Sequence, residues 1–347
     1  MHFAASVPDI NDIVDILYEQ PESIKQGGKR ENLSPGHLAV LAKEPHMDLI
    51  ERLKEYDPNF GRSVTSHIVA KTKKSTTYLH LAAQYSNSVE VISELIRICP
   101  EVLEMRDSSR CTPLLRCLTN QTSAAPDILQ AIVDAAPQTA SMEHPVTGEM
   151  PLHLLVGGLN KVPETSKVRM IHLLLRAFPE AMIIPDQYGM LPIRAAARSA
   201  KLAVLKALVE ANPGYELLDF DVAVEAASEE KWDNLTYIHS IKPELFMTVY
   251  TGYPLLHHAM YEFLPRKEED FLSMQAILSL SPDAARLLKE NGNNLLHAFM
   301  YGCSSRLNIV PAAWDTLIEV TSAPHPRGSH RYQRIWRDTL RPVGSWQ

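Results

Sequence analysis

The chain has 347 residues and a formal net charge of −7, with 45% hydrophobic and 22% charged residues. These values are close to those of an average globular protein and exclude a largely disordered, collagen-like or coiled-coil chain. No run of about 18 apolar residues occurs, and the N-terminus has no basic segment followed by an apolar block, so we expect neither a membrane span nor a secretory signal. Four scattered cysteines favour a reducing compartment, so we expect a cytoplasmic protein, with a nuclear location as the alternative.

The first predicted element is a lone helix over residues 9–20, followed by a loop, and together they form an N-terminal capping segment over residues 1–33. Ile13, Ile16 and Leu17 give this helix one apolar side. The Gly27–Arg30 segment has no preceding strand and no Ser or Thr after its lysine, so we interpret it as a loop rather than a phosphate-binding site.

A proline closes an apolar, helix-like segment eight times, at spacings of 37, 42, 37, 42, 34, 30 and 39 residues. Apolar residues stand eight and five positions before each proline, a spacing that predicts one side of an α-helix. Because proline lacks an N–H and disfavours helical geometry in the preceding residue, we expect each helix to end there. The prolines are Pro21, Pro58, Pro100, Pro137, Pro179, Pro213, Pro243 and Pro282, with Pro324 as a candidate ninth.

A second motif lies between these prolines and predicts the start of another helix. Thr77-Tyr-Leu-His-Leu-Ala-Ala is the fullest copy, and Val224 marks a degraded copy. In this motif Thr or Ser caps the helix, proline takes the first helical position, and alanine lets a neighbouring helix approach closely. The other copies begin at Ser34, Thr112, Met150, Leu191, Pro254 and Asn294.

These residues resemble the ankyrin repeat family, whose pattern is G-x-T-P-L-H-x-A-A followed by a second amphipathic helix. Residues 34–322 match as about eight divergent copies, although the units run from 30 to 43 residues instead of 33. The resemblance implies an all-α solenoid of stacked helix pairs with extended finger loops, monomeric and followed by a tail over residues 323–347. Tetratricopeptide and HEAT repeats fit less well because their helices are closely joined. The matching turn residues are Asp107, Gly148, Asp186, Gly189, Gly252, Asn291 and Gly292.

The histidines do not form a metal-binding pattern. Five of them occupy one repeat position, where the resemblance implies hydrogen bonds to the backbone of their own and neighbouring units. No HExxH motif, paired CxxC, nucleophile motif or phosphate-binding motif occurs, so we predict no enzyme activity, no metal and no cofactor. We interpret Cys111 and Cys117 as packed side chains, and Asp219 and Asp221 as a helix cap. The five histidines are His37, His80, His153, His257 and His297.

Two basic segments have alternative interpretations. We interpret Lys71–Lys74 as a solvated loop, with a nuclear import signal or an anion site as the alternative. The C-terminal tail carries arginines on one predicted helix face, so it is either a polar cap on the last repeat or a surface that binds nucleic acid or an anionic membrane. Its candidate residues are Arg331, Arg334, Trp336, Arg337 and Arg341.

The predicted function is a protein–protein interaction scaffold that uses the concave face of the solenoid, with one or more protein partners. Nucleic-acid binding through residues 327–341 is the alternative. We also expect the stack to be weakest, or to change curvature, in the degraded copy over residues 213–243. Candidate contact residues are polar or aromatic residues that the packing pattern leaves unexplained: Gln84, Tyr85, Arg106, Arg110, Arg116, Gln187, Tyr188, Met190, Arg198, Tyr250, Tyr253 and Asn293.

Overall fold

The computed structural model divides into two compact units, which meet in the chain between Leu217 and Leu218. The predicted helix over residues 9–20, the motif copy at Ser34, Asn293 and the tail over residues 323–347 lie outside the described residues. None of the described helices is both long enough and apolar enough to cross a membrane. The structure describes residues 47–56, 65–69, 72–157, 162–212, 214, 216–229, 231–250, 252–262, 275, 278–279, 281–287, 295 and 298.

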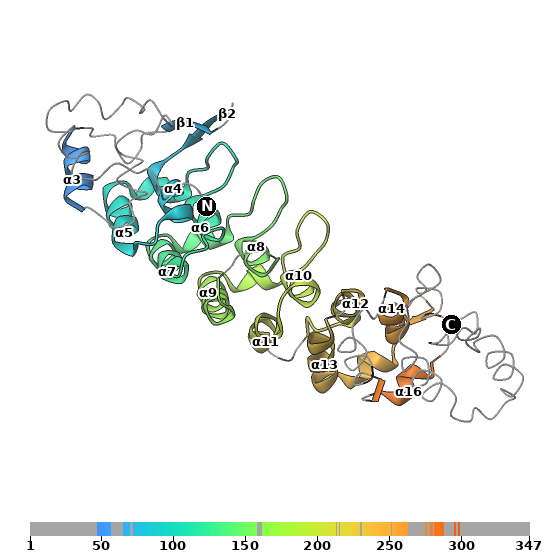
Figure 1. Ribbon diagram of the computed structural model, residues 1–347. Coiled ribbons are helices and arrows are strands. Elements are labelled where there is room, and N and C mark those ends of the chain that lie inside the picture. The colour runs from blue at the N-terminus through green and yellow to red at the C-terminus, as the bar shows by residue number, and fades with distance from the viewer. Residues whose placement is uncertain are drawn as a thin grey trace, which may run out of the picture. The chain divides into compact units, whose positions relative to one another are not determined.

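Helices of the first unit alternate between two layers, and successive helices of each layer contact one another (Figure 1). This arrangement confirms the predicted all-α solenoid of stacked helix pairs. The first layer contains α4 (Tyr78–Tyr85), α6 (Pro113–Cys117), α8 (Pro151–Gly157) and α10 (Pro192–Ser199). The second layer contains α5 (Val89–Ile98), α7 (Ala125–Ala135), α9 (Glu164–Ala177) and α11 (Leu202–Glu210), and α3 (Met47–Tyr56) precedes both layers.

The predicted apolar side of each second helix forms the core between the layers. In five successive repeats, the residues that stand eight and five positions before the repeat proline are each at most 2% exposed to solvent. Their burial removes the apolar side of each helix from water, which no single repeat could do alone. These residues are Ile92, Leu95, Leu129, Ile132, Ile171, Leu174, Leu205, Leu208, Leu235 and Ile238.

The repeat prolines end one helix and also begin another turn. Cys99, Ala136 and Phe178 end their helices with φ of −148° and ψ of 75° to 84°, outside the helical region that proline disfavours in the preceding residue. The prolines then open short 3-10 helices, which the sequence analysis did not predict. These are η3 (Pro100–Glu104), η4 (Pro137–Ser141) and η5 (Pro179–Met182).

The basic segment before α4 is an antiparallel hairpin, so its interpretation as a loop is wrong. Strand β1 (Thr65–Val69) pairs with β2 (Thr72–Thr76), and Lys73 and Lys74 lie within β2. Thr residues favour a strand, and the two-residue connection is the length of a tight hairpin turn. The lysines had suggested a solvated loop, although the flanking β-branched residues were a signal for a strand.

The second unit begins with the degraded repeat, which folds as a complete helix pair. Asp219 caps its first helix by accepting a hydrogen bond from the Val222 N–H at 2.9 Å, as predicted. The elements are α12 (Phe220–Ser228), α13 (Trp232–Ile241), η7 (Pro243–Met247), β3 (Val249–Tyr250), β4 (Tyr253–Pro254), α14 (Leu255–Glu262) and α16 (Pro282–Ala285).

We expect the backbone amides of α12 and α13 to exchange faster than those of α7 and α9. The degraded repeat has a short finger, and the division between the two units falls at its start. Local opening begins where packing between neighbouring repeats is least extensive. Native-state hydrogen exchange of the full chain measures this, and equal protection of these four helices contradicts the prediction.

Candidate functional site

Tight turns form the tips of the fingers that lead into the first-layer helices. We define finger 1 as residues 105–111, finger 2 as residues 142–149 and finger 3 as residues 183–190. In finger 1 the Asp107 Oδ1 accepts the N–H groups of Ser109 at 2.8 Å and Cys111 at 3.1 Å. In finger 3 the Asp186 Oδ1 accepts the N–H groups of Tyr188 and Met190 at 2.8 and 2.9 Å. Both aspartates therefore hold turns, as the resemblance implied.

Finger 1 differs from the others in its left-handed residue. Gly148 and Gly189 have φ of +64° and +78° in fingers 2 and 3, whereas finger 1 places Arg110 at φ of +62°. A side chain in this conformation brings Cβ close to a carbonyl oxygen and costs roughly 1–2 kcal/mol. Finger 1 therefore keeps an exposed arginine at a position that glycine would fill with less strain.

Replacing Arg110 by glycine should stabilise the protein by about 0.5–1 kcal/mol, because the relief of strain exceeds the added freedom of the unfolded chain. Gly189→Ala is the opposite control. Nothing lies within 4 Å of a Cβ built at Gly189, so its loss of about 1 kcal/mol comes from the backbone alone. Urea unfolding of the full chain compares the two variants, and an unchanged or lower midpoint for Arg110→Gly contradicts the assignment of strain.

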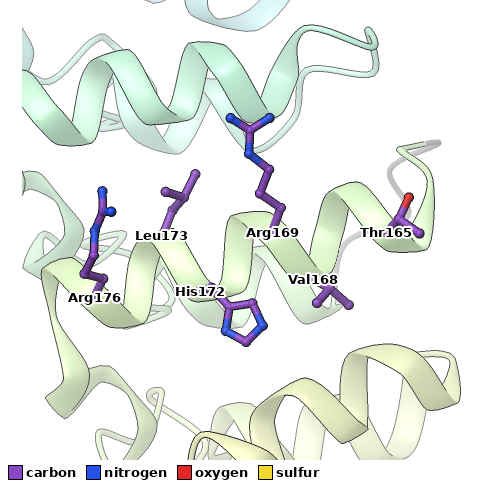
Figure 2. Close-up of a pocket in the computed structure, with 6 residues that line it drawn as sticks. All are labelled: Thr165, Val168, Arg169, His172, Leu173 and Arg176. Carbon is purple, nitrogen blue, oxygen red and sulfur yellow. The ribbon is translucent and has the colours of Figure 1, made fainter.

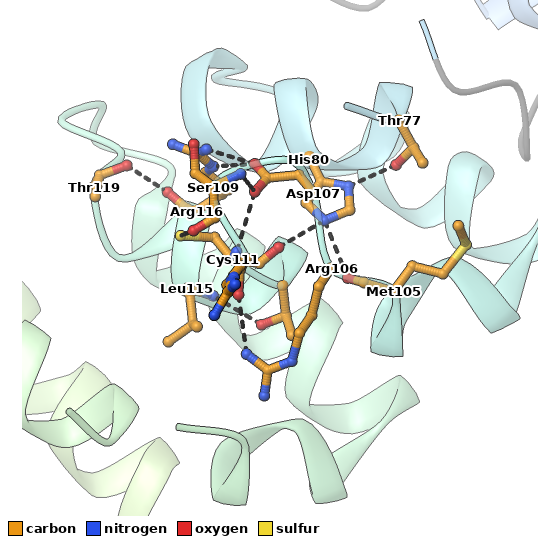
Figure 3. A network of polar contacts seen from close by, with 12 residues as sticks. Thr77, His80, Met105, Arg106, Asp107, Ser109, Cys111, Leu115, Arg116 and Thr119 are labelled. Carbon is orange, nitrogen blue, oxygen red and sulfur yellow. Dashed lines mark hydrogen bonds and ion pairs between the residues drawn. The ribbon is translucent and has the colours of Figure 1, made fainter. Parts of the chain in front are cut away.

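A buried ion pair connects finger 1 to α6 (Figure 3). The Asp107 side chain is fully buried, and its Oδ2 accepts a hydrogen bond from the Arg116 Nε at 2.7 Å. Arg116 is only 19% exposed. The charge of Arg116 was predicted to contact a partner, yet its guanidinium compensates a carboxylate inside the protein, and sequence reasoning missed this role.

Two of the five repeat histidines, His80 and His153, bind the neighbouring finger, as the resemblance implied, while His37 and His297 lie outside the described residues. The Nε2 of His80 lies 3.1 Å from the Met105 carbonyl and 3.0 Å from the Cys111 carbonyl, and its Nδ1 lies 2.7 Å from the Thr77 hydroxyl. Because Nε2 faces carbonyl oxygens, it carries the proton and donates. Thr77 was predicted to cap α4, but its side chain makes no cap bond because the hydroxyl serves His80.

His153 makes the same kind of contacts two repeats further along the chain. Its Nδ1 accepts the Met150 N–H at 3.2 Å, and its Nε2 donates to the Met190 carbonyl at 2.8 Å. Where leucine replaces histidine, at Leu115, the Thr112 hydroxyl is released from this role and caps α6 by accepting the Leu115 N–H at 3.3 Å. His80 and His153 therefore connect a finger to a first-layer helix, and both nitrogens of each ring already lie within hydrogen-bond distance of protein atoms.

Stability should fall as the pH drops below about 6.5, the ordinary pKa of histidine in an unfolded chain. Burial lowers the pKa of His80 and of His153. The unfolded chain then binds more protons below pH 6.5, so stability is complete above that pH and is lost below it, by at most about 1.4 kcal/mol per pH unit for each histidine. Urea unfolding between pH 5.5 and 7.5 measures the slope.

His153→Gln should reduce this slope, because glutamine does not titrate. His172→Gln removes an exposed histidine of α9 and is the matched control. A slope that changes equally in both variants rules out the buried histidine as its source.

Neighbouring fingers are also hydrogen-bonded to one another. The Arg106 Nη1 donates to the Arg110 carbonyl and to the Glu143 carbonyl of finger 2, both at 2.9 Å. The Gln187 N–H of finger 3 donates to the Thr147 carbonyl of finger 2 at 3.2 Å. Arg106 and Gln187 were predicted as contact residues, and the structure adds that both connect neighbouring fingers while remaining exposed.

The remaining candidates differ in exposure. Tyr188 at the tip of finger 3 is 81% exposed and Tyr85 at the end of α4 is 59% exposed, while Arg110 and Arg198 are exposed as well. Gln84 and Met190 are half-buried. Tyr253 belongs to the second unit, and its ring lies 5.5 Å from the ring of His258. The side chain of Tyr250 lies outside the described residues, as do Asn293, Arg331, Arg334, Trp336, Arg337 and Arg341.

Asn120 is a buried residue whose importance the sequence did not reveal. Its Nδ2 donates to the carbonyls of Ala83 at 3.0 Å and Ser86 at 2.9 Å, and its Oδ1 accepts the Thr122 N–H at 2.8 Å. The side chain therefore connects the end of α4 to the loop after α6. Although Asn120 begins an N-x-S/T triplet, its fully buried amide is not accessible for glycosylation.

The described residues offer little basis for a metal site, a reactive cysteine or an enclosed ligand pocket. No group of three His, Cys, Asp or Glu residues there is arranged to hold a metal ion. Burial raises the pKa of the Cys111 and Cys117 thiols, which makes them poor nucleophiles. A shallow depression of about 380 Å³ lies over α9 (Figure 2), lined by Thr165, Val168, Arg169, His172, Leu173 and Arg176. It is open, and its residues come from one helix.

Comparison with known proteins supports the fold. The structure resembles the crystal structure of the ankyrin repeat domain of Bcl-3, "a unique member of the IkappaB protein family", with a TM-score of 0.51 and 14% identity over 72% of this chain and 99% of that chain. The human ASB11 ankyrin repeat domain matches with a TM-score of 0.49 and 13% identity over 72% and 100%. No family model and no curated protein matches. At this identity the likeness to Bcl-3 establishes an ankyrin-like fold.

Proposed function

We propose that the protein is a non-catalytic scaffold that binds one or more protein partners through the first layer and the fingers of its first unit. This is the face that a repeat stack presents as an extended concave surface. The proposal combines the ankyrin-like fold with the predicted contact residues that remain exposed.

The exposure of Tyr188 is the observation that carries the proposal. This ring is 81% exposed at the tip of finger 3, while that finger is itself held by hydrogen bonds to Asp186 and to finger 2. A large aromatic side chain on a rigid support provides much contact area at little cost in conformational entropy, and tyrosine is enriched among residues that dominate binding. Tyr85 adds a second exposed ring on α4, 59% exposed.

Site-specific photo-crosslinking in the full chain tests this surface. p-Benzoylphenylalanine at Tyr85 or Tyr188 should cross-link a partner protein from native lysate. The same group at Arg176, which is 66% exposed on α9 of the second layer, should not. Cross-links that form only from position 176 contradict the proposed face and favour the second layer.

The alternative of anionic-surface binding through the tail remains a separate prediction. A chain that ends at Ala323 should retain its cross-linked partners if the repeats form the binding surface. If capture needs the tail and falls steeply with salt, the arginine-rich segment is the functional element.

A further inference from the structure

Both ring nitrogens of His153 take part in holding finger 3 on helix α8. The Nε2 donates to the Met190 carbonyl at the end of finger 3 at 2.8 Å, and the Nδ1 accepts the Met150 N–H at 3.2 Å. The side chain is buried, at 3% exposure. The same Met190 carbonyl accepts the Asp186 N–H at 3.0 Å. The histidine is therefore bound to the atom that also closes the turn of finger 3.

The contact at Nδ1 requires a neutral ring. A protonated histidine carries a hydrogen on both nitrogens, so its Nδ1 becomes a donor. It would then face the Met150 N–H, which is also a donor. This N–H is held in place because Met150 is buried and its carbonyl accepts the Leu154 N–H at 3.3 Å. Turning the ring away would break the bond from Nε2, so a protonated His153 is incompatible with the anchored finger.

His80 makes a contrasting set of contacts with finger 1 (Figure 3). Its Nε2 also faces carbonyls of the finger, but its Nδ1 lies 2.7 Å from the Thr77 hydroxyl. A hydroxyl can donate or accept, and its hydrogen rotates to suit. A protonated His80 can therefore donate to Thr77 and keep its bonds to finger 1. The two histidines differ in their response to acid, although burial lowers the pKa of both.

The charges near His153 oppose the effect of burial without cancelling it. Burial is the largest influence and lowers the pKa of His153, while the carboxylates of Glu149 and Asp186 raise it. A substitution of His153 alone leaves every other ionisable group in place and so isolates the ring. Those on the elements packed against α8 are Glu143 and His144 of finger 2, Arg116 and Cys117 of α6, Arg194 and Arg198 of α10, and Glu164, Lys167, Arg169, His172 and Arg176 of α9.

We propose that His153 is a pH-sensitive anchor that releases finger 3, and with it the exposed ring of Tyr188, in acid. The inference rests on the proposed scaffold function, in which Tyr188 is the main contact residue. Once the finger is released, the pKa of His153 returns to the ordinary value of about 6.5. Each pH unit below that value then multiplies the population of the released finger by at most about tenfold. Partner binding through Tyr188 falls as the anchored fraction falls.

Hydrogen exchange of the full chain at pH 5.5 and 7.5, corrected for the intrinsic effect of pH on exchange, tests the release. Finger 3 should open about three- to tenfold more at pH 5.5. Finger 1 should change little, although Asp107 holds its turn in the same way. The reporter amides are those of Gln187, Tyr188, Gly189 and Met190 in finger 3, and those of Ser109 and Cys111 in finger 1.

His153→Gln should abolish the pH dependence of finger 3, because glutamine does not titrate. His172→Gln, at the exposed histidine of α9, should retain it. The inference is overturned if finger 3 of the parent chain opens equally at both pH values or if fingers 1 and 3 open equally in acid. Acid release that persists in His153→Gln also overturns it.

Photo-crosslinking separates this inference from the proposed function. With p-benzoylphenylalanine at Tyr188, the yield of cross-linked partner should fall about threefold or more from pH 7.5 to 5.5, relative to the yield from Tyr85 on α4. The fall should disappear in His153→Gln. If finger 3 opens in acid while the relative yield stays constant, Tyr188 does not hold the partner, and the proposed contact fails with the inference. If cross-links form at both pH values and finger 3 does not open, the inference alone fails.

Discussion

Replacing Phe246 by alanine should destabilise the second unit by about 3–5 kcal/mol, the usual cost of removing a buried aromatic side chain and leaving a cavity. Phe246 is fully buried on η7, which contacts α13, α14 and α16. Its ring lies 4.7 Å from the His239 ring at an angle of 88°, an edge-to-face arrangement that adds specific packing. Urea unfolding, read together with hydrogen exchange of α13 and α14, measures the loss.

Met247→Ala is the matched control for this substitution. Met247 is the next residue of the same 3-10 helix and is 47% exposed, so its removal leaves no buried cavity. We expect a change within about 0.5 kcal/mol. Equal losses in the two variants would mean that the substitutions disturb the backbone of η7 and that burial of the ring is not the cause.

Replacing Asp107 by alanine should cost about 3 kcal/mol, because it leaves the Arg116 guanidinium largely buried without its counter-charge. The same change removes the acceptor for the Ser109 and Cys111 N–H groups, so the turn of finger 1 also loses its side-chain support. Asp107→Asn should lose less, since an amide oxygen can still accept from these N–H groups. Urea unfolding of the full chain compares the three proteins.

Asp127→Ala provides the control on the second layer. Asp127 pairs with Arg169 at 2.7 Å, but both side chains are 52% exposed. Solvent screens such pairs, so we expect a loss within about 1 kcal/mol. If Asp127→Ala costs as much as Asp107→Ala, burial does not explain the importance of the Asp107–Arg116 pair.

Local chemistry made the repeat predictable. The apolar side of each second helix consists of residues only three or four positions apart, and a proline marks the end of that helix. Periodicity alone therefore located core residues such as Ile92 and Leu129. Asp219 caps α12, and Asp107 and Asp186 hold their turns, because these interactions span only two to four residues. The 3-10 helices were missed, although an apolar pair such as Val102 and Leu103 stands two and three positions after Pro100, Pro179 and Pro243.

The candidate site depends on contacts that the linear pattern does not contain. Arg116 seemed free for a partner because Asp107 lies nine residues away, in a different element, and only folding of finger 1 against α6 brings them together. Likewise Asn120 reaches carbonyls of Ala83 and Ser86 more than thirty residues earlier. The sequence gives no sign that the backbone of Arg110 is left-handed. This conformation arises from the turn that the Asp107 side chain holds.

The sequence by itself determined the helix pairs, their order and the apolar sides that force them to stack, because those properties arise from short-range periodicity and from the backbone limits of proline. Only the tertiary structure decided which polar residues serve the fold and which remain available. Hydrogen bonds and ion pairs between repeats depend on distances between residues about one repeat apart, and burial decides whether a charge such as that of Arg116 is satisfied inside the protein.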